Sequence, residues 1–262
     1  MNPVAFAFLL TLSAGLFAGV GGLIAIFAKD TNRKFLSVCL SFSAGVMIYL
    51  SFTEIFLEAY HSLSYVYGSN GLLFAVLGFF GGMGIIGVVD KLIPQEDASD
   101  FVTDKKTFCR QDKKDLKRVG IFSAVAIAKH NLLEGVVTFM AAIHDPALGI
   151  AIAIAIAIHN IPEGIAVAVP IKYATGSKLK AVSLAFASGL TEPLGGLIAY
   201  LFFMQVFYEG LFGILFASVG GVMIYISFHT LLPTAAKYGE HSTVMKGLFS
   251  GMAVMAVSLL FI

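Results

Sequence analysis

Long apolar stretches dominate this sequence, and they restrict the chain to a membrane. Eight of them come close to the roughly 20 residues that a helix needs to cross a bilayer. Only 13% of the residues are charged and 58% are hydrophobic, whereas soluble domains carry about 25% charged residues. Backbone groups inside a bilayer must be hydrogen-bonded within the chain, so we predict an all-α membrane protein with eight transmembrane helices. The expected spans are 4–27, 35–58, 71–89, 119–142, 147–170, 181–204, 209–233 and 243–262.

The basic residues predict how the spans are oriented. Of the 17 Lys and Arg residues, all except Lys129 lie in or beside the first, third, fifth and seventh connections. Basic connections stay in the cytoplasm, so we expect both termini outside and residues 1–262 to form a single transmembrane domain. The long connection 90–118 is expected to be a cytoplasmic loop that acts as a tether, with a regulatory role as the alternative. No basic tract suggests nucleic-acid binding.

Two ordered blocks of the sequence repeat. Residues 45–52 match residues 221–228 at seven of eight positions, and residues 15–25 match 189–199 at seven of eleven. The third and eighth spans match faintly, at 71–72 and 247–248. The repeat is displaced by five spans, an odd number, so the units 1–3 and 6–8 are predicted to be inverted. Inverted repeats around a midplane site are typical of transporters, although packing alone can also preserve a duplication.

Two copies of one motif place ionisable residues inside the apolar spans. The first reads HNLLEG at 130–135 and the second HNIPEG at 159–164. A charge at the bilayer centre costs roughly 2.5–3.5 kcal/mol, so such residues indicate a functional site. Histidine and glutamate four residues apart share one helix face, and together with amides they suit a divalent metal such as zinc. The predicted ligands are His130, Asn131, Glu134, His159, Asn160 and Glu163.

The connection between the two motif-bearing spans is short. Residues 144–146 join them, which predicts a tight hairpin with both copies at similar depth. Bare carboxylates in an apolar interior attract protons as well as metal ions. We therefore expect metal and protons to compete for Glu134 and Glu163.

Other polar residues within the spans are candidates for a metal pathway. Glu192 in span 181–204 is predicted to be an additional ligand. Met47 and Glu54 share one face of a regular helix, and Glu54 either relays metal or lies near the outer mouth. His229 is a candidate exit ligand near the cytoplasmic end of its span, with a histidine satisfied by its neighbours as the alternative.

Lys129 and Pro162 make the two motif copies unequal. Pro162 is expected to kink its helix and free the carbonyl of Ile158, whereas Leu133 leaves the other helix straight. Lys129 has two interpretations. Its ammonium either takes the place of a second metal and pairs with a glutamate, or its long stem carries the charge away from the hydrocarbon.

The paired motifs, the eight spans and the long connection resemble the ZIP (ZRT/IRT-like) family of divalent metal transporters, in particular its bacterial ZupT-like branch. The resemblance implies uptake of zinc through a bacterial inner membrane, with iron, manganese, cobalt and cadmium as alternative cargo. It also implies a 3+2+3 arrangement of helices around the helix 4/5 hairpin. The metal is cargo and no resident cofactor is expected; the candidate assembly is a homodimer in the lipid bilayer.

The resemblance also implies roles for individual residues. It places His130, Glu134, His159 and Glu163 in a primary metal site. It places Asn131, Asn160 and Glu192 in a second site that the glutamates bridge, with Met47 and Glu54 on helix 2.

Two functions other than transport use a similar set of residues. An intramembrane metal-dependent hydrolase, such as a zinc protease, usually carries His-Glu-x-x-His with the glutamate as base. Here asparagine follows each histidine, which favours a transporter over an enzyme. A metal sensor with little flux would bind metal through the same residues without carrying it.

Overall fold

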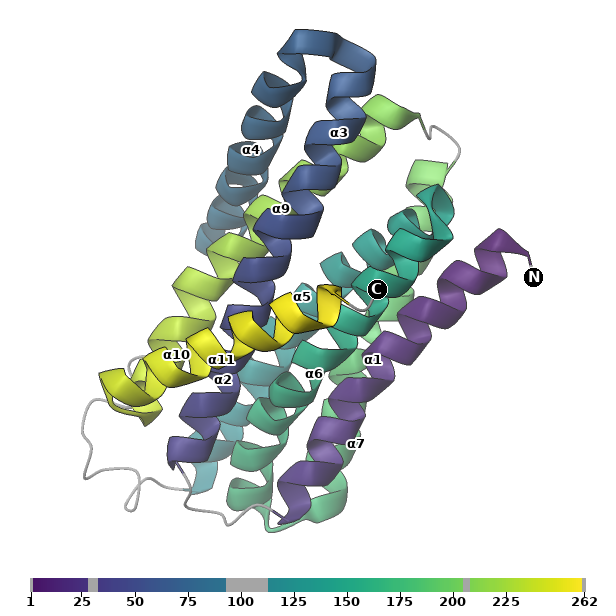
Figure 1. Cartoon of the computed structure of the whole chain (residues 1–262). Coiled ribbons are helices and arrows are strands. Elements are labelled where there is room, and N and C mark those ends of the chain that lie inside the picture. Colours follow the sequence, from purple (N-terminus) through teal and green to yellow (C-terminus); the bar gives the residue numbers. More distant parts are fainter. Residues whose placement is uncertain (1, 28–32, 93–112, 205–207, 261–262) are drawn as a thin grey trace.

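The structure, a computed structural model, describes residues 2–27, 33–92, 113–204 and 208–260. Apart from short turns these residues are helical, and none of them lies in a strand (Figure 1). The prediction of an all-α protein is therefore confirmed for the described part of the chain. Most of the connection 90–118 lies outside it. The helices are α1 (Pro3–Phe27), α2 (Arg33–Leu50), η1 (Ser51–Ile55), α3 (Phe56–Tyr67), η2 (Gly68–Asn70), α4 (Gly71–Leu92), α5 (Lys113–His144), α6 (Pro146–Thr175), α7 (Lys178–Gly189), α8 (Thr191–Ile198), η3 (Ala199–Phe203), α9 (Glu209–Ile226), η5 (Ser227–Leu231), α10 (Leu232–Tyr238) and α11 (His241–Leu259).

Within the described residues, six helical stretches are long and apolar enough to cross a membrane. They are Pro3–Phe27, Lys34–Lys91, Pro146–Lys172, Lys178–Phe203, Glu209–Tyr238 and His241–Leu259. The second stretch holds two expected spans, 35–58 and 71–89, with the turn η2 between them. Helix α5 covers the expected span 119–142. The chain is therefore an integral membrane protein.

The hairpin of α5 and α6 turns on a single residue, Asp145. Its side chain accepts a hydrogen bond of 2.7 Å from the backbone N–H of Ala147, which caps the start of α6. Pro146 follows at the first helical position, where a missing N–H costs nothing. Helix α6 then runs through Pro162 to Gly176, whose φ of 66° ends the helix in the left-handed region that favours glycine.

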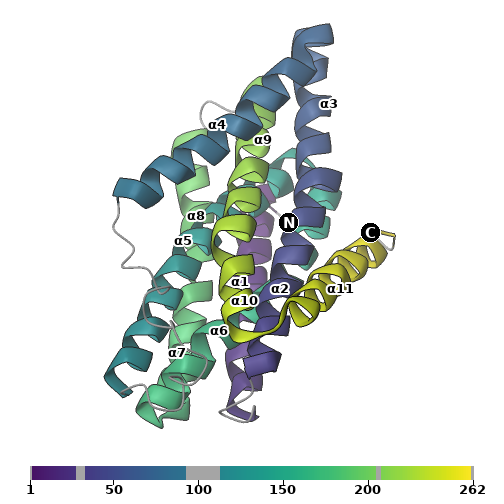
Figure 2. The same cartoon turned by 90° about the vertical axis from the view of Figure 1, so that its left-hand side faces the viewer.

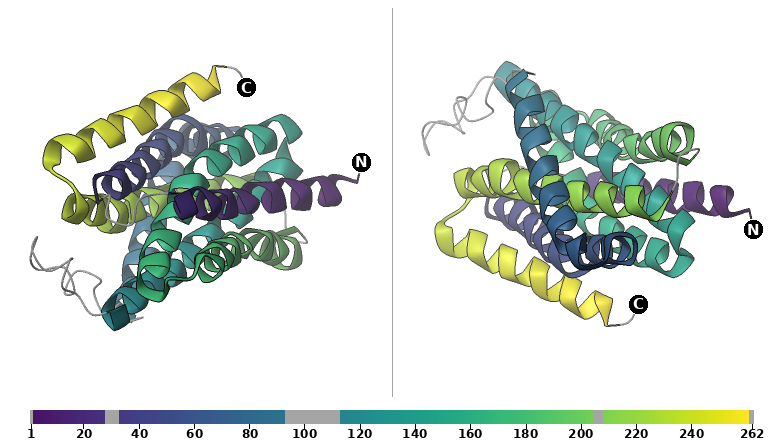
Figure 3. Two further views of the ribbon diagram at one scale, coloured as in Figure 1. Left: turned by 90° about the horizontal axis from the view of Figure 1, so that it is seen from below. Right: turned by 90° about the horizontal axis from the view of Figure 1, so that it is seen from above.

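The hairpin lies at the centre of the bundle. Helix α1 packs along α6, and α5 packs against both α6 and α8. Helix α11 crosses α2 on one side, while α4 packs along α9 on the other (Figures 2 and 3). We call the end with the α3–α4 turn the upper end and the end where α1 stops the lower end, as they lie in Figure 1.

Glycines bring the hairpin helices into backbone contact with their neighbours. A Cβ added to Gly164 in α6 would collide with the carbonyl oxygen of Ala18 in α1, and one added to Gly135 in α5 would collide with that of Glu192 in α8. Each glycine is the last residue of its motif copy, and Ala18 and Glu192 occupy the same position in the repeated blocks 15–25 and 189–199. The two motif copies therefore make matching contacts with matching residues of the sequence repeat.

The outer helices also make matching contacts. Gly45 in α2 packs on the carbonyl of Leu248 in α11, and Gly221 in α9 packs on that of Phe79 in α4. Gly45 and Gly221 are the first residues of the repeated blocks 45–52 and 221–228, as the repeat predicts. These contacts make Phe79 the counterpart of Leu248. They align α4 with α11 in a register different from the faint match of 71–72 with 247–248.

Both repeat units also change helix type at matching residues. The π-helical turns η1 and η5 begin at Ser51 and Ser227, which occupy the same position in the repeated blocks. In each, the serine hydroxyl donates to the carbonyl four residues earlier, at 2.7 Å to Met47 and 2.8 Å to Met223. Such back-bonding competes with the regular helical ladder, which gives a local cause for the wider turns.

Candidate metal centre

The hairpin brings the histidines and glutamates of both motif copies into one cluster. In α5, Nε2 of His130 lies 2.9 Å from Oε1 of Glu134. Nε2 of His159 in α6 lies 2.6 Å from that same oxygen, and Nε2 of His130 lies 3.6 Å from Oε1 of Glu163. The i, i+4 spacing on each helix and the single-residue turn between the helices produce this convergence.

The cluster is closed off from solvent and has the dimensions of a metal site. His130 is 3% exposed, Glu134 1%, and His159 and Glu163 are fully buried. Ligand atoms of His130, His159 and Glu163 all lie within 4.8 Å of one another. Imidazole nitrogens and a carboxylate oxygen at these separations fit the first coordination shell of zinc.

The two asparagines hold the hairpin to the neighbouring helices. Nδ2 of Asn131 donates to the carbonyl of Ser188 at 3.1 Å, and Nδ2 of Asn160 donates to that of Ala14 at 3.0 Å. Asn160 also donates a short hydrogen bond to Oε1 of Glu192, which is fully buried. Glu192 therefore adjoins the second motif copy through Asn160.

Several buried oxygens in this region have no hydrogen-bond donor among the described residues. They are Oδ1 of Asn131 and of Asn160, and Oε2 of Glu134, Glu163 and Glu192. A buried acceptor without a partner costs about 1–3 kcal/mol, and more when it is charged. A divalent cation would satisfy these oxygens and offset the charge of the three carboxylates.

Helix α2 contributes Ser43, which the sequence reasoning did not single out. Its hydroxyl donates to Oε1 of Glu163 at 3.4 Å, and Ser43 itself is fully buried. Met47, one helical turn further along α2, is fully buried and accepts a long contact of 4.0 Å from the hydroxyl of Ser227. Glu54 lies in the π-helical turn η1. The wider turn removes the regular spacing that placed Glu54 on one face with Met47.

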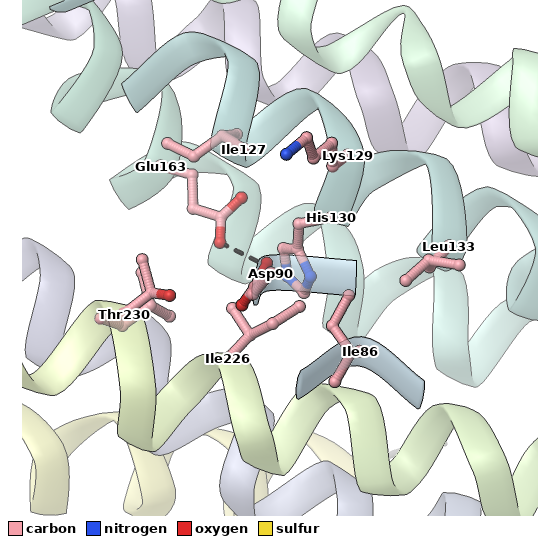
Figure 4. Close-up of a pocket in the computed structure, with 10 residues that line it drawn as sticks. Ile86, Asp90, Ile127, Lys129, His130, Leu133, Glu163, Ile226 and Thr230 are labelled. Carbon is pink, nitrogen blue, oxygen red and sulfur yellow. Dashed lines mark ion pairs between the residues drawn. The ribbon is translucent and has the colours of Figure 1, made fainter. Parts of the chain in front are cut away.

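A cavity of about 50 Å³ reaches the cluster from one side. It contains room for a few water molecules. Figure 4 shows side chains from α4, α5, α6 and α9 around it, with His130 and Glu163 in its wall. The remaining lining residues are Ile86, Asp90, Ile127, Lys129, Leu133, Ile226, Thr230 and Leu231. The lining residue Ile127 lies one turn before His130 on α5, which rises from the lower end (Figure 2). Thr230 and Leu231 lie in η5, which continues α9 downward, so the cavity adjoins the cluster on its lower side.

Lys129 and His229 lie on this lower side. Lys129 lines the cavity, and no carboxylate of the described residues lies within 4.0 Å of its ammonium. The pairing with a glutamate that one of its two interpretations expects is therefore not formed among these residues. His229 is exposed, and its Nδ1 lies 3.9 Å from Oδ2 of Asp90. Its ring stacks on Tyr225 with centroids 4.8 Å apart.

A second polar cluster lies at the upper end, and nothing in the sequence connects its members. His144, the last residue of α5, has Nε2 3.4 Å from Oε1 of Glu58 in α3 and 3.8 Å from Oε1 of Glu209 in α9. Ser62 donates to Glu209 at 2.8 Å, and the imidazole of His144 stacks on Phe212. The hydrogen bond to Glu58 raises the pKa of His144, against the opposing effect of burial. The three ionisable residues come from separate helices, so only the fold reveals them.

Comparison with known proteins points to one family. A family model described as ZIP zinc transporter matches residues 94–259. The zinc transporter ZupT of Lysinibacillus sphaericus is 52% identical over 264 residues, covering 99% of this chain and 98% of the relative. ZupT of Chlorobaculum parvum is 50% identical over 263 residues, with the same coverage of each chain. ZupT of Oceanobacillus iheyensis is 50% identical over 267 residues and covers both chains completely.

Proposed function

Because this chain belongs to the ZIP zinc transporter family, we propose that it carries zinc across the membrane into the cytoplasm. Iron, manganese, cobalt and cadmium are alternative cargo, and the metal is a substrate and not a resident cofactor. The observation that carries the proposal is the buried cluster of His130, His159 and Glu163, whose ligand atoms lie within 4.8 Å of one another inside an apolar bundle.

The proposed ligands divide into two groups around the glutamates. His130, His159, Glu134 and Glu163 would hold a first ion, since their nitrogens and oxygens converge. Asn131, Asn160 and Glu192 offer buried oxygens without donors among the described residues, which supports a second position beside the first. Met47 would offer a thioether next to Ser43, and Asp90 and His229 would receive the ion at the lower end.

Access to the cluster from one side supports a carrier. The cavity below His130 and Glu163 leads toward Asp90, while Leu50 and Ile55 above are fully buried. A site that opens to one side at a time lets an ion cross without a continuous pore. In this conformation the ion would leave or arrive through the lower end.

The proposed topology has eight spans in a 3+2+3 arrangement, with residues 1–262 as one transmembrane domain. The matching glycine contacts of α1 with α6 and of α8 with α5 support inverted repeats around the hairpin. The basic connections support a cytoplasmic lower end, including the loop 90–118, with both termini outside. A bacterial inner membrane would accommodate this orientation.

A homodimer is the proposed assembly within the bilayer. Apolar side chains such as Leu73, Leu77 and Phe80 on α4 are exposed, and either lipid or a second copy would cover them. The mass of the protein in nanodiscs, measured at several protein-to-lipid ratios, distinguishes the two. A monomer at every ratio would rule out the dimer.

The decisive test of the function is metal flux in proteoliposomes for the wild type and Glu163→Ala. We expect zinc uptake by the wild type and background uptake by Glu163→Ala, because the variant removes a carboxylate from the centre of the cluster. Glu240→Ala, which removes an exposed carboxylate at the start of α11, serves as the control and should transport normally. Retained flux in Glu163→Ala would refute the proposed site, and zinc binding without flux in the wild type would identify a sensor.

A further inference from the structure

Lys129 gives the lower cavity a positively charged side chain. Among the described residues that line this cavity, it is the only basic side chain apart from His130. Figure 4 shows its ammonium pointing toward the side of the cavity where Ile127 and Glu163 lie. An ion moving between Glu163 and Asp90 through this cavity therefore passes near the positive charge of Lys129.

No described residue neutralises the ammonium of Lys129. Within the described part of the chain, no carboxylate lies within 4.0 Å of it. Lys172 shows the contrasting behaviour, because its ammonium donates to the carbonyl of Ile26 at 3.0 Å and so binds the end of α1. Lys129 makes no bond of this kind to any described residue, so its charge acts on whatever occupies the cavity.

The second motif copy has no corresponding charge. His159 corresponds to His130, so Ile158 in α6 occupies the place of Lys129 in α5. Ile158 instead helps to line an apolar groove between α1 and α6, together with Ser13 and Ile161. The two motif copies make matching backbone contacts. At this position, however, the first copy has a cation and the second an apolar side chain.

We propose that Lys129 lowers the affinity of the cluster for a divalent cation that enters or leaves through the lower cavity. The lower affinity speeds release of the cation into that cavity. The inference rests on the proposed function. When the cation leaves, the flexible stem lets the ammonium move toward Glu163 and compensate its bare carboxylate. The ammonium of Lys129 thus competes with the ion for the carboxylate of Glu163, and no covalent bond is made or broken.

Coulomb repulsion between Lys129 and the cation predicts a measurable loss of metal affinity. The repulsion between a unit charge and a dication about 6 Å away, at the dielectric constant of water of about 80, corresponds to roughly tenfold in affinity. A less polar surrounding makes the effect larger. A charge cannot drive net flux by itself, since it is present in both directions of transport. It makes the apparent affinities at the two faces of the membrane unequal.

The test compares zinc transport in right-side-out and inside-out membrane vesicles for the wild type, Lys129→Met and Lys129→Arg. We expect Lys129→Met to lower KM about tenfold at the face served by the lower cavity, to lower Vmax with it, and to change KM much less at the opposite face. Lys129→Arg keeps the charge and should behave as the wild type. Lys178→Met, which removes an exposed lysine at the start of α7, controls for surface charge.

A second measurement covers the case in which a variant inserts poorly. Competition between purified protein and a zinc chelator should show about tenfold tighter binding for Lys129→Met, with wild-type affinity for Lys129→Arg. Unchanged values of KM and affinity, weaker binding, or an equal change at both faces would each overturn the inference. A parallel Glu163→Ala sample separates this failure from failure of the proposed site, because retained zinc binding by Glu163→Ala would refute the site itself.

Discussion

The upper and lower ends of the bundle are built from helices that make matching contacts, yet they differ in access to the candidate site. On the lower side, Ile226 is half-buried and lines the cavity beside the cluster. Its counterpart in the repeated block, Leu50 on the upper side, is fully buried. The same backbone architecture is thus open at one end and packed at the other.

The side chains at the two ends explain the difference. At the upper end, His144 on the hairpin lies between Glu58 of α3 and Glu209 of α9, so ionic contacts join three helices. At the lower end, Lys129 and Asp90 line a cavity and are not within ion-pair distance of each other. Matching backbones therefore do not impose equal access, because side-chain contacts across helices decide which end is closed.

The last glycine of each motif copy should tolerate substitution least. Gly164→Ala and Gly135→Ala each place a Cβ against a neighbouring carbonyl, at Ala18 and Glu192, and backbone cannot move aside cheaply. We expect each variant to lower the free energy of unfolding by about 2 kcal/mol, the usual cost of overpacking. Unfolding in mixed micelles, followed by circular dichroism, measures it.

Gly81→Ala is the matched control, because a Cβ there meets nothing within 4 Å. It should be neutral or slightly stabilising, since alanine favours a helix over glycine. If only one of the two motif variants were destabilised, the two contacts would not be equivalent.

The difference in access is testable by thiol labelling. In a background without native cysteines, Ile226→Cys should react with a small water-soluble maleimide about tenfold faster than Leu50→Cys. The reason is that Ile226 borders the cavity and Leu50 is fully buried, so labelling of Leu50→Cys requires an opening of roughly 1.4 kcal/mol or more. Equal rates would show that the upper end is as open as the lower one.

The smallest effect should come from the ionic contacts at the upper end. Because Glu58 raises the pKa of His144, the stabilising contact is complete below the ordinary value of 6.5 and is lost as the pH rises through the raised value. We expect His144→Gln to lower the free energy of unfolding by about 0.5–1 kcal/mol at pH 6, as for partly exposed ion pairs.

The pH profile provides the control for this prediction. The difference between wild type and His144→Gln should shrink toward alkaline pH, where the imidazole of the wild type is neutral. Measurements of unfolding from pH 5 to pH 9 test it. A difference that does not vary with pH would indicate that stacking of His144 on Phe212, and not its charge, stabilises the upper end.

The candidate site was largely accessible to sequence reasoning because its determinants are local. A four-residue spacing sets His130 over Glu134 and His159 over Glu163, and a single-residue turn at Asp145 fixes the depth of the two helices relative to each other. The sequence did not predict a role for Ser43, because a serine inside an apolar helix usually forms a hydrogen bond with its own backbone. Its contact with Glu163 joins residues 120 positions apart.

Three features follow from the amino-acid sequence alone: the chain is helical, lies in a membrane and carries paired histidines and glutamates in its interior. Hydrophobic length and helical periodicity act within one segment, and they can be read without knowing the partners. Three others required the folded structure: the cavity on the lower side of the cluster, the correspondence of Phe79 in α4 with Leu248 in α11, and the contact of His144 with two glutamates of other helices. These features depend on contacts between distant segments, and the packing of the whole bundle selects them.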